Sequence, residues 1–372
     1  PAGTNETDWY YGMLGQFGLL KGHLAESFEL IKPGTIIFHV RQGVHWALNP
    51  KSAASQLVNG REFTADDVVF SLTRHALKSP LTTMYQRFTA IGKPPTITKL
   101  DKYTVEVKVD PDMLGYGLTM LGNFTLMWPH EVIEKYGDMK DWRNSVGTGP
   151  FMVTEYVAGS AMTYVRNPNF FMTDPVGPGK GNQLPYLDGF RTLIIPDPST
   201  SQAAFRTGKI DRMDSLTGED WEGFMKQRPD LKYKASLSIG SLPAGRLDKP
   251  ALPFKDIRVR QAMNLAVNKK EILDNYYKGR GALFAVPVPP GPSHAKMFTP
   301  LEEQPSQPTI PGSRASVQEL FTYNPEKAKL LLKEAGYPNG FKTEFVVSPT
   351  GIDLASILKD QLSKVGIELV LK

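Results

Sequence analysis

The sequence predicts an α/β fold that divides into at least two lobes, and three observations support this prediction. The chain has 372 residues, which is more than one hydrophobic core usually holds. Residues 34–41, GTIIFHVR, alternate between two faces as a strand does. Residues 342–348, 353–365 and 366–372 follow the order strand, helix, strand, which is typical of α/β proteins.

The first helix is predicted from its N-terminal signals. Within NGREFTADDVVFSLTRHAL, residues 59–77, Thr64 can cap a helix together with Asp67 three positions later. Asp66 and Asp67 occupy the first turn, where the helix dipole favours carboxylates. Two adjacent acids could also serve acid–base catalysis, but helix capping accounts for both of them.

The next segments read as a hairpin followed by helices. Residues 96–109 form two strands around a turn at Leu100–Lys102. The uncharged run 113–129 is shorter than the ~20 apolar residues of a membrane span, so we interpret it as a core segment. A short helix over 129–138 ends at Gly137, and His130 and Glu131 at its start are given a capping role.

A glycine turn opens the middle of the chain. Gly147–Pro150 precedes two strands that end at Asn167–Pro168, and the pattern predicts a strained turn in which glycine permits unusual backbone angles. A strand over 190–195, a helix over 199–207 that Gly208 ends, and a strand over 210–213 are expected next.

Two helices dominate the last third. Residues 253–279 carry apolar positions at helical spacing. The second helix has Asn324 as its cap, Pro325 in its first turn and Gly336 as its stop. Between them, residues 283–313 are dense in proline and predict an ordered crossing segment or a surface loop.

Composition and motifs argue against an enzyme. The chain has no cysteine, which excludes disulfides, thiolate nucleophiles and cysteine-type zinc sites. The six histidines never recur at i+2 or i+4, and no HExxH, G-x-S-x-G or P-loop pattern occurs; GPGKGN at 177–182 reads as a glycine turn. We therefore expect no catalytic residues, no metal and no cofactor. The net charge of +5 is scattered along the chain, so a nucleic-acid partner is not expected.

Several blocks, in order, resemble the family 5 extracellular solute-binding proteins of ABC transporters, the oligopeptide, dipeptide and nickel-binding class. The blocks cover nearly the whole chain, and an insert, ALNPKSAASQLV, precedes Asn59. Their order is as diagnostic as their content. They are HLAESFEL with TIIFHVRQGVHW, NGREFTADDVVFSLTR, VGTGPFMVTEY with VRNPNFF, AAFRTGKIDRMD, PFKDIRVRQAMNLAVNKKEIL and YNPEKAKLLLKEAGYPNGF.

The resemblance implies a two-lobed periplasmic-binding-protein-like fold, class II and cluster C type, with an extra small α/β domain on the first lobe. The implied domains are 1–145, the small extra domain of lobe I; 146–236, its main sheet domain; and 237–372, lobe II. Compared with the family pattern, both ends look truncated, and lobe II looks incomplete at its C-terminal end. The glycine turn at 147–150 then joins the small domain to the main sheet.

The same resemblance implies the function: capture of a peptide or other small polar solute between two lobes, and its delivery to the permease of an ABC importer. The protein would be periplasmic or at the cell surface after removal of a signal peptide, and it would meet the membrane only through a possible upstream lipid anchor. An alternative is a chaperone-like or signalling binding protein on the same fold. An enzyme on this scaffold is a third reading, which the missing motifs disfavour.

The candidate ligand-binding residues lie at the implied cleft edges. Met84 and Tyr85 follow Ser79–Pro80, and Tyr85 could stack on a ligand or hydrogen-bond to it. Asn123 and Ser215 could bond to ligand amides, and Asp214 could meet a cationic group. The alternative for each residue is a structural role in a surface loop or in the core.

Overall fold

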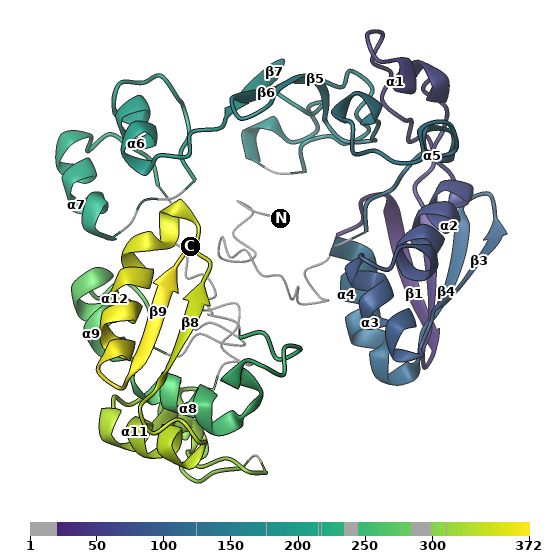
Figure 1. The fold of residues 1–372 in the computed structure, drawn as a ribbon. Coiled ribbons are helices and arrows are strands. Elements are labelled where there is room, and N and C mark those ends of the chain that lie inside the picture. Colours follow the sequence, from purple (N-terminus) through teal and green to yellow (C-terminus); the bar gives the residue numbers. More distant parts are fainter. Residues whose placement is uncertain are drawn as a thin grey trace. The chain divides into compact units, whose positions relative to one another are not determined.

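The computed structural model of the chain describes residues 21–123, 125–175, 177–214, 216, 218–233, 245–283, 299–309 and 311–372. The chain forms two compact units (Figure 1). Over the described residues, unit 1 extends to Ile194 and unit 2 runs from Ile195 to Lys372. Each unit has its own hydrophobic core and is described by itself.

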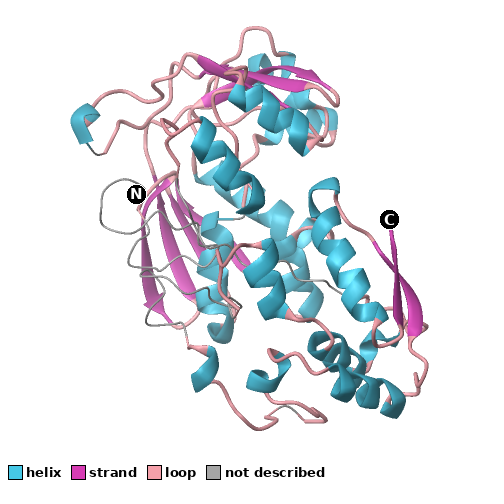
Figure 2. Ribbon diagram, turned by 90° about the vertical axis from the view of Figure 1, so that its left-hand side faces the viewer, coloured by secondary structure: helices cyan, strands magenta, loops and turns pink. Residues whose placement is uncertain are grey.

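Unit 1 contains a four-stranded antiparallel sheet in the order β1-β2-β4-β3, whose strands lie side by side in Figure 2. The predicted strand at 34–41 and the predicted hairpin at 96–109 are confirmed. The strand β1 was not recognised from periodicity, because most of its positions are exposed on both faces. The strands are β1 Ala25–Lys32, β2 Thr35–Val40, β3 Thr96–Asp101 and β4 Thr104–Lys108.

Short helices pack with this sheet around one core. Residues 114–123 of the uncharged run form α4, Leu114–Asn123, and Leu118, Met120 and Leu121 are buried there, which confirms the expected core segment for this part of the run. Leu126, after the helix, is exposed. Among the residues that the structure describes, no helix is both long enough and apolar enough to cross a membrane. The other helical elements of this part are α1 Ala53–Val58, α2 Ala65–Thr73, η2 Arg74–Lys78, α3 Thr83–Arg87, η3 Thr89–Ile91, η4 Pro111–Met113, α5 His130–Tyr136 and η5 Trp142–Asn144.

A buried ion cluster connects α2 to α5. Thr64 and Asp67 form the predicted capping box, and Asp67 is fully buried. The Arg61 guanidinium donates to Asp67 Oδ2 at 2.9 Å and Oδ1 at 2.7 Å, and to both carboxylate oxygens of Glu131. The capping role predicted for His130 and Glu131 is wrong. Pro129 is the N-cap residue, the Glu131 carboxylate accepts hydrogen bonds from Arg61, and His130 Nδ1 lies 3.2 Å from a Glu134 oxygen.

The ion cluster shifts the pKa values of Arg61 and Glu131 in the directions expected of a charge-paired site. Hydrogen bonds to Asp67 and then to Glu131 raise the pKa of Arg61. Burial by itself raises the pKa of Glu131, but the hydrogen bonds and the charge of Arg61 outweigh burial and leave that pKa lowered. Both shifts favour the charged forms of Arg61 and Glu131.

A three-stranded antiparallel sheet, β5-β6-β7, follows in unit 1. The turn before it is not strained, contrary to the prediction, because neither Gly147 nor Gly149 has a left-handed backbone. Asn167 holds the turn instead: it is 1% exposed, its Nδ2 donates to Gly149 O at 2.9 Å, and its backbone N–H donates to Pro150 O at 2.8 Å. The elements are β5 Phe151–Val157, β6 Ala161–Arg166, η6 Gly177–Gly179 and β7 Gly189–Leu193.

Unit 2 ends in the predicted strand-helix-strand unit, in which β8 and β9 pair in parallel and α12 lies beside β9 (Figure 1). The predicted cap at Asn324 is confirmed, since its side chain accepts from the Lys327 backbone N–H at 3.0 Å. The elements are α6 Pro198–Arg206, α7 Gly218–Gln227, η7 Pro253–Lys255, α8 Ile257–Leu265, α9 Lys269–Glu271, η8 Ile272–Tyr276, η10 Leu301–Glu303, α10 Val317–Leu320, α11 Pro325–Glu334, β8 Phe341–Phe345, η11 Pro349–Gly351, α12 Ile352–Ser363 and β9 Ile367–Leu371.

Two expectations for unit 2 are corrected. The helix predicted over 253–279 is interrupted, because Asn268 caps a new helix by accepting from the Glu271 backbone N–H at 3.1 Å. The strand predicted over 210–213 is irregular, with two exposed and two half-buried residues, and no described strand pairs with it.

The three-part domain division stays a prediction. Its first boundary, at 145/146, separates the two sheets within unit 1. Its second boundary, at 236/237, lies outside the described residues, as does about half of the proline-rich stretch 283–313, mainly residues 284–298.

Candidate functional site

The candidate residues of unit 1 differ in their accessibility. Met84, on α3, is 2% exposed and belongs to the hydrophobic core, where its sulfur accepts from Thr125 Oγ1 at 3.1 Å. Tyr85 is half-buried, so part of its side chain can meet a ligand. Asn123 ends α4, and its side chain lies outside what the structure describes. Burial favours a packing role for Met84 and leaves Tyr85 as the stronger candidate.

In unit 2, Asp214 is exposed and forms an ion pair with Arg212 at 3.1 Å. Ser215 lies outside the described residues. An exposed ion pair of this kind contributes at most about 1 kcal/mol to stability. The Asp214 carboxylate can therefore exchange Arg212 for another cationic group at little cost.

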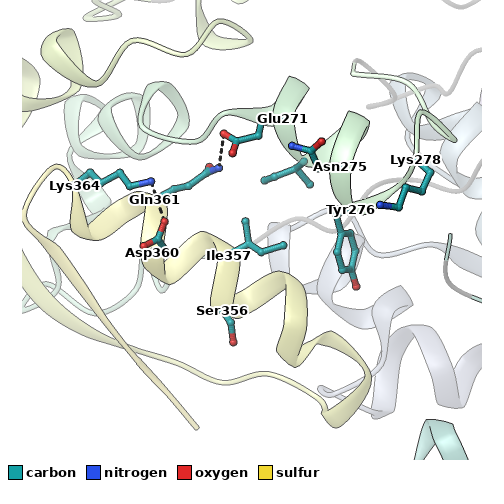
Figure 3. A pocket seen from close by; sticks show the side chains of 10 residues that line it. Glu271, Asn275, Tyr276, Lys278, Ser356, Ile357, Asp360, Gln361 and Lys364 are labelled. Atoms are coloured by element: carbon teal, nitrogen blue, oxygen red, sulfur yellow. Dashed lines mark hydrogen bonds and ion pairs between the residues drawn. The ribbon is translucent and has the colours of Figure 1, made fainter. Parts of the chain in front are cut away.

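A pocket of about 600 Å³ lies within unit 2, between η8 and α12 (Figure 3). The sequence did not predict it, because its two walls are more than 70 positions apart in the chain and each reads as an ordinary amphipathic helix. The lining residues are Glu271, Ile272, Asn275, Tyr276, Lys278, Ser356, Ile357, Asp360, Gln361 and Lys364.

The pocket carries charges of both signs. Asp360 and Lys364 pair at 2.9 Å along α12, and this pairing raises the pKa of Lys364. Gln361 Nε2 lies 3.5 Å from Glu271 Oε2 and connects the walls, as the dashed lines in Figure 3 show. Lys278 has a left-handed backbone with φ of 53°, which is unusual outside glycine and asparagine. Such a lining suits a small polar molecule that carries one positive and one negative group.

Neither pocket chemistry nor sequence points to a metal. Within the described parts of the chain, no group of three or more histidine, aspartate or glutamate side chains is arranged to hold a metal ion.

A partly buried lysine, Lys269, lies two positions before the lining residue Glu271 and gives a testable pH dependence. Lys269 Nζ donates to Asn264 O at 2.6 Å, near the end of α8, and to Leu320 O at 2.9 Å, at the end of α10. Burial lowers the pKa of Lys269 to about 8 from an ordinary value of 10.5. Between these two values the unfolded chain binds more protons than the folded chain, so this group makes stability rise with pH.

We expect the difference in free energy of unfolding, wild type minus Lys269→Met, to rise by about 2 kcal/mol from about pH 7 to about pH 9.5. Urea unfolding of both proteins at several pH values measures the difference. Lys270→Met is the matched control, because Lys270 is exposed and its pair with Asp274 is on the surface. A difference that stays flat across this range would show that Lys269 keeps its proton in the folded chain.

The family of the chain follows from comparison with known sequences. The family described as "Bacterial extracellular solute-binding proteins, family 5 Middle" matches residues 20–372. The chain belongs to this family. The resemblance drawn from the sequence blocks is thereby confirmed.

Family 5 relatives with curated names include a haem-binding and a dipeptide-binding protein. "Heme-binding protein A" of Haemophilus influenzae is 30% identical over 340 residues, which covers 88% of this chain and 55% of the relative. "Dipeptide-binding protein" of Escherichia coli (strain K12) is 28% identical over 372 residues, covering 93% and 62%. The chain thus spans about 55–62% of the length of these relatives.

Solved structures confirm the fold class. The ABC transporter-associated periplasmic binding protein DppA of Helicobacter pylori, in complex with the peptide STSA, has a TM-score of 0.67 and 26% identity, covering 95% of this chain and 64% of that chain. The oligopeptide-binding protein AppA of Bacillus subtilis, in complex with a nonapeptide, has a TM-score of 0.68 and 22% identity, covering 94% and 65%. The α/β fold of periplasmic binding proteins is therefore shown for this chain.

Proposed function

We propose that this chain is part of the extracytoplasmic solute-binding component of an ABC importer, and that its solute is a short peptide. The observation that carries the proposal is the family 5 match over residues 20–372. Dipeptide-binding and glutathione-binding relatives, together with a peptide-bound structural neighbour, favour a peptide over other solutes. The partners are then the peptide and the permease subunits of the importer.

The mechanism is capture without covalent chemistry. Two lobes close over the solute by hinge motion, and burial of the solute provides the affinity while a few polar groups set its orientation. Tyr85 stacks on the solute or hydrogen-bonds to it, and Asp214 binds its amino group in place of Arg212. Asn123 and Ser215 form hydrogen bonds with the amides of the solute. The buried Met84, next to Tyr85 in the sequence, packs in the core and supports α3 rather than touching the solute.

Native mass spectrometry of the whole protein, purified from its source, tests the solute class. We expect a copurified peptide, recovered chemically unchanged. Peptide added at 100 times its dissociation constant should stabilise the protein by about 2.7 kcal/mol in thermal unfolding. Binding of haem without peptide would replace the proposed solute, broad binding of unfolded chains would favour a chaperone-like role, and cleavage of the peptide would overturn the transport assignment.

Substitution of Asp214 tests its proposed role. We expect Asp214→Asn to weaken peptide affinity about tenfold, which corresponds to about 1.4 kcal/mol, because the amide cannot neutralise the peptide ammonium. Titration calorimetry measures the change. Asp230→Asn is the matched control: Asp230 is also exposed and also pairs with an arginine two positions earlier, Arg228, at 2.8 Å. Equal affinities of the two variants would remove Asp214 from the site.

A further inference from the structure

A second pocket lies in unit 1, where α2 passes into η2. Its volume is about 230 Å³, and five residues line it: Val69, Phe70, Thr73, Arg74 and Lys78. Two of them are cations, two are apolar, one is a hydroxyl residue, and none is an acid. A small pocket with this lining favours an anion that also has an apolar part.

The two cations are four positions apart on one helical segment. Like charges at this spacing destabilise a helix by about 0.2–0.5 kcal/mol. The segment η2, Arg74–Lys78, is a π-helix. This form is rare in proteins overall, and where it occurs it is often at a functional site. No acid lines the pocket. The backbone and side chain of Lys140 bind the Asp138 carboxylate and lower its pKa, and Asp138 is also close enough for the Arg74 charge to help lower that pKa.

Arg74 is held in place but incompletely satisfied. Its Nη2 donates to Gly137 O at 3.1 Å, and its guanidinium lies over the Trp128 ring at 5.3 Å. Its Nε is buried and has no hydrogen-bond acceptor among the described residues. A buried donor without an acceptor costs about 1–3 kcal/mol. Lys78, at the other end of η2, is exposed and forms no ion pair with any described residue.

We propose that this pocket binds a small organic carboxylate with a short aliphatic group. The carboxylate lies between Arg74 and Lys78, since the planar guanidinium matches carboxylate geometry. The aliphatic group packs on Val69 and Phe70, and the Thr73 hydroxyl supplies a further donor. Inorganic phosphate fits less well, because its strongly hydrated oxygens would have to face the apolar wall. This site lies on unit 1 alone and does not depend on the proposed peptide binding.

Titration with isovalerate tests the proposal, with the NMR signals of the valine methyl groups recorded at each concentration. The Val69 signals are assigned as those missing from the spectrum of Val69→Ala. We expect saturable shifts of these signals at millimolar isovalerate, and an affinity about tenfold lower for Lys78→Met. Lys51→Met, an exposed lysine of unit 1 that does not line the pocket, should bind as the wild type does.

Two further probes separate the parts of the proposal. Isovaleramide has the same shape without the charge and should not shift the Val69 signals, and inorganic phosphate should shift them less than isovalerate at equal concentration. Three results would overturn the assignment: shifts of the Val69 signals with isovaleramide as large as with isovalerate, larger shifts with phosphate than with isovalerate, or an isovalerate affinity that Lys78→Met does not change. So would the absence of any shift at millimolar isovalerate.

Discussion

Replacement of Arg61 by methionine lowers the free energy of unfolding of unit 1 by about 3–5 kcal/mol, the usual cost of removing one partner from a buried ion pair. Asp67 is fully buried, and the side chain of Glu131 is only 21% exposed. Without the guanidinium, both carboxylates lose their cation; because the Arg61 side chain itself is 31% exposed, we expect a loss toward the lower end of this range. Urea unfolding followed by tryptophan fluorescence measures the loss.

Lys99→Met is the control for this experiment. Lys99 pairs at 2.8 Å with Asp66, the neighbour of Asp67 in the first turn of α2, but the Asp66 side chain is 63% exposed. Removal of an exposed pair changes stability by at most about 1 kcal/mol. If the two variants lost the same stability, burial of the Arg61 cluster would not be what makes it important.

Replacement of Leu331 by alanine lowers the free energy of unfolding of unit 2 by about 3 kcal/mol, because it leaves a cavity in a packed core. Leu331 lies on α11, is 2% exposed, and belongs to the core that α8, α11, α12 and β9 share. Chemical denaturation of the wild type and the variant measures the difference.

Leu330→Ala is the matched control, because Leu330 precedes Leu331 on the same helix but is 53% exposed. Its truncation should change stability by no more than about 0.5 kcal/mol, since it neither opens a cavity nor alters a buried contact. A larger loss from Leu330→Ala than from Leu331→Ala would mean that α11 packs with a different face toward the core.

The candidate ligand-binding residues show how far sequence reasoning reaches in a site. Met84 and Tyr85 are adjacent, and the sequence gives no reason to separate them, yet Met84 is in the core and Tyr85 is half-buried. Side chains at neighbouring helix positions point about 100° apart, so only the packing of α3 decides which one is accessible. The two pockets were not predicted either, and the reason is the same: packing decides which side chains line a pocket.

Local signals determined most of the secondary structure. The alternation at residues 34–41, the capping box of Thr64 and Asp67, and the Asn324 cap each involve residues within a few positions of one another. Backbone sterics and local hydrogen bonds decide such features, so the sequence contains them directly. The ordered blocks likewise determined the family.

Tertiary structure alone decided the contacts between distant residues. Glu131 was expected to cap its own helix, but it binds Arg61, 70 positions away. The glycine turn was expected to be strained, but Asn167 holds it from 18 positions away, through its side chain. In both cases, a polar group that burial would leave unsatisfied takes the partner that packing brings to it. That partner follows from the three-dimensional arrangement of the elements rather than from local periodicity.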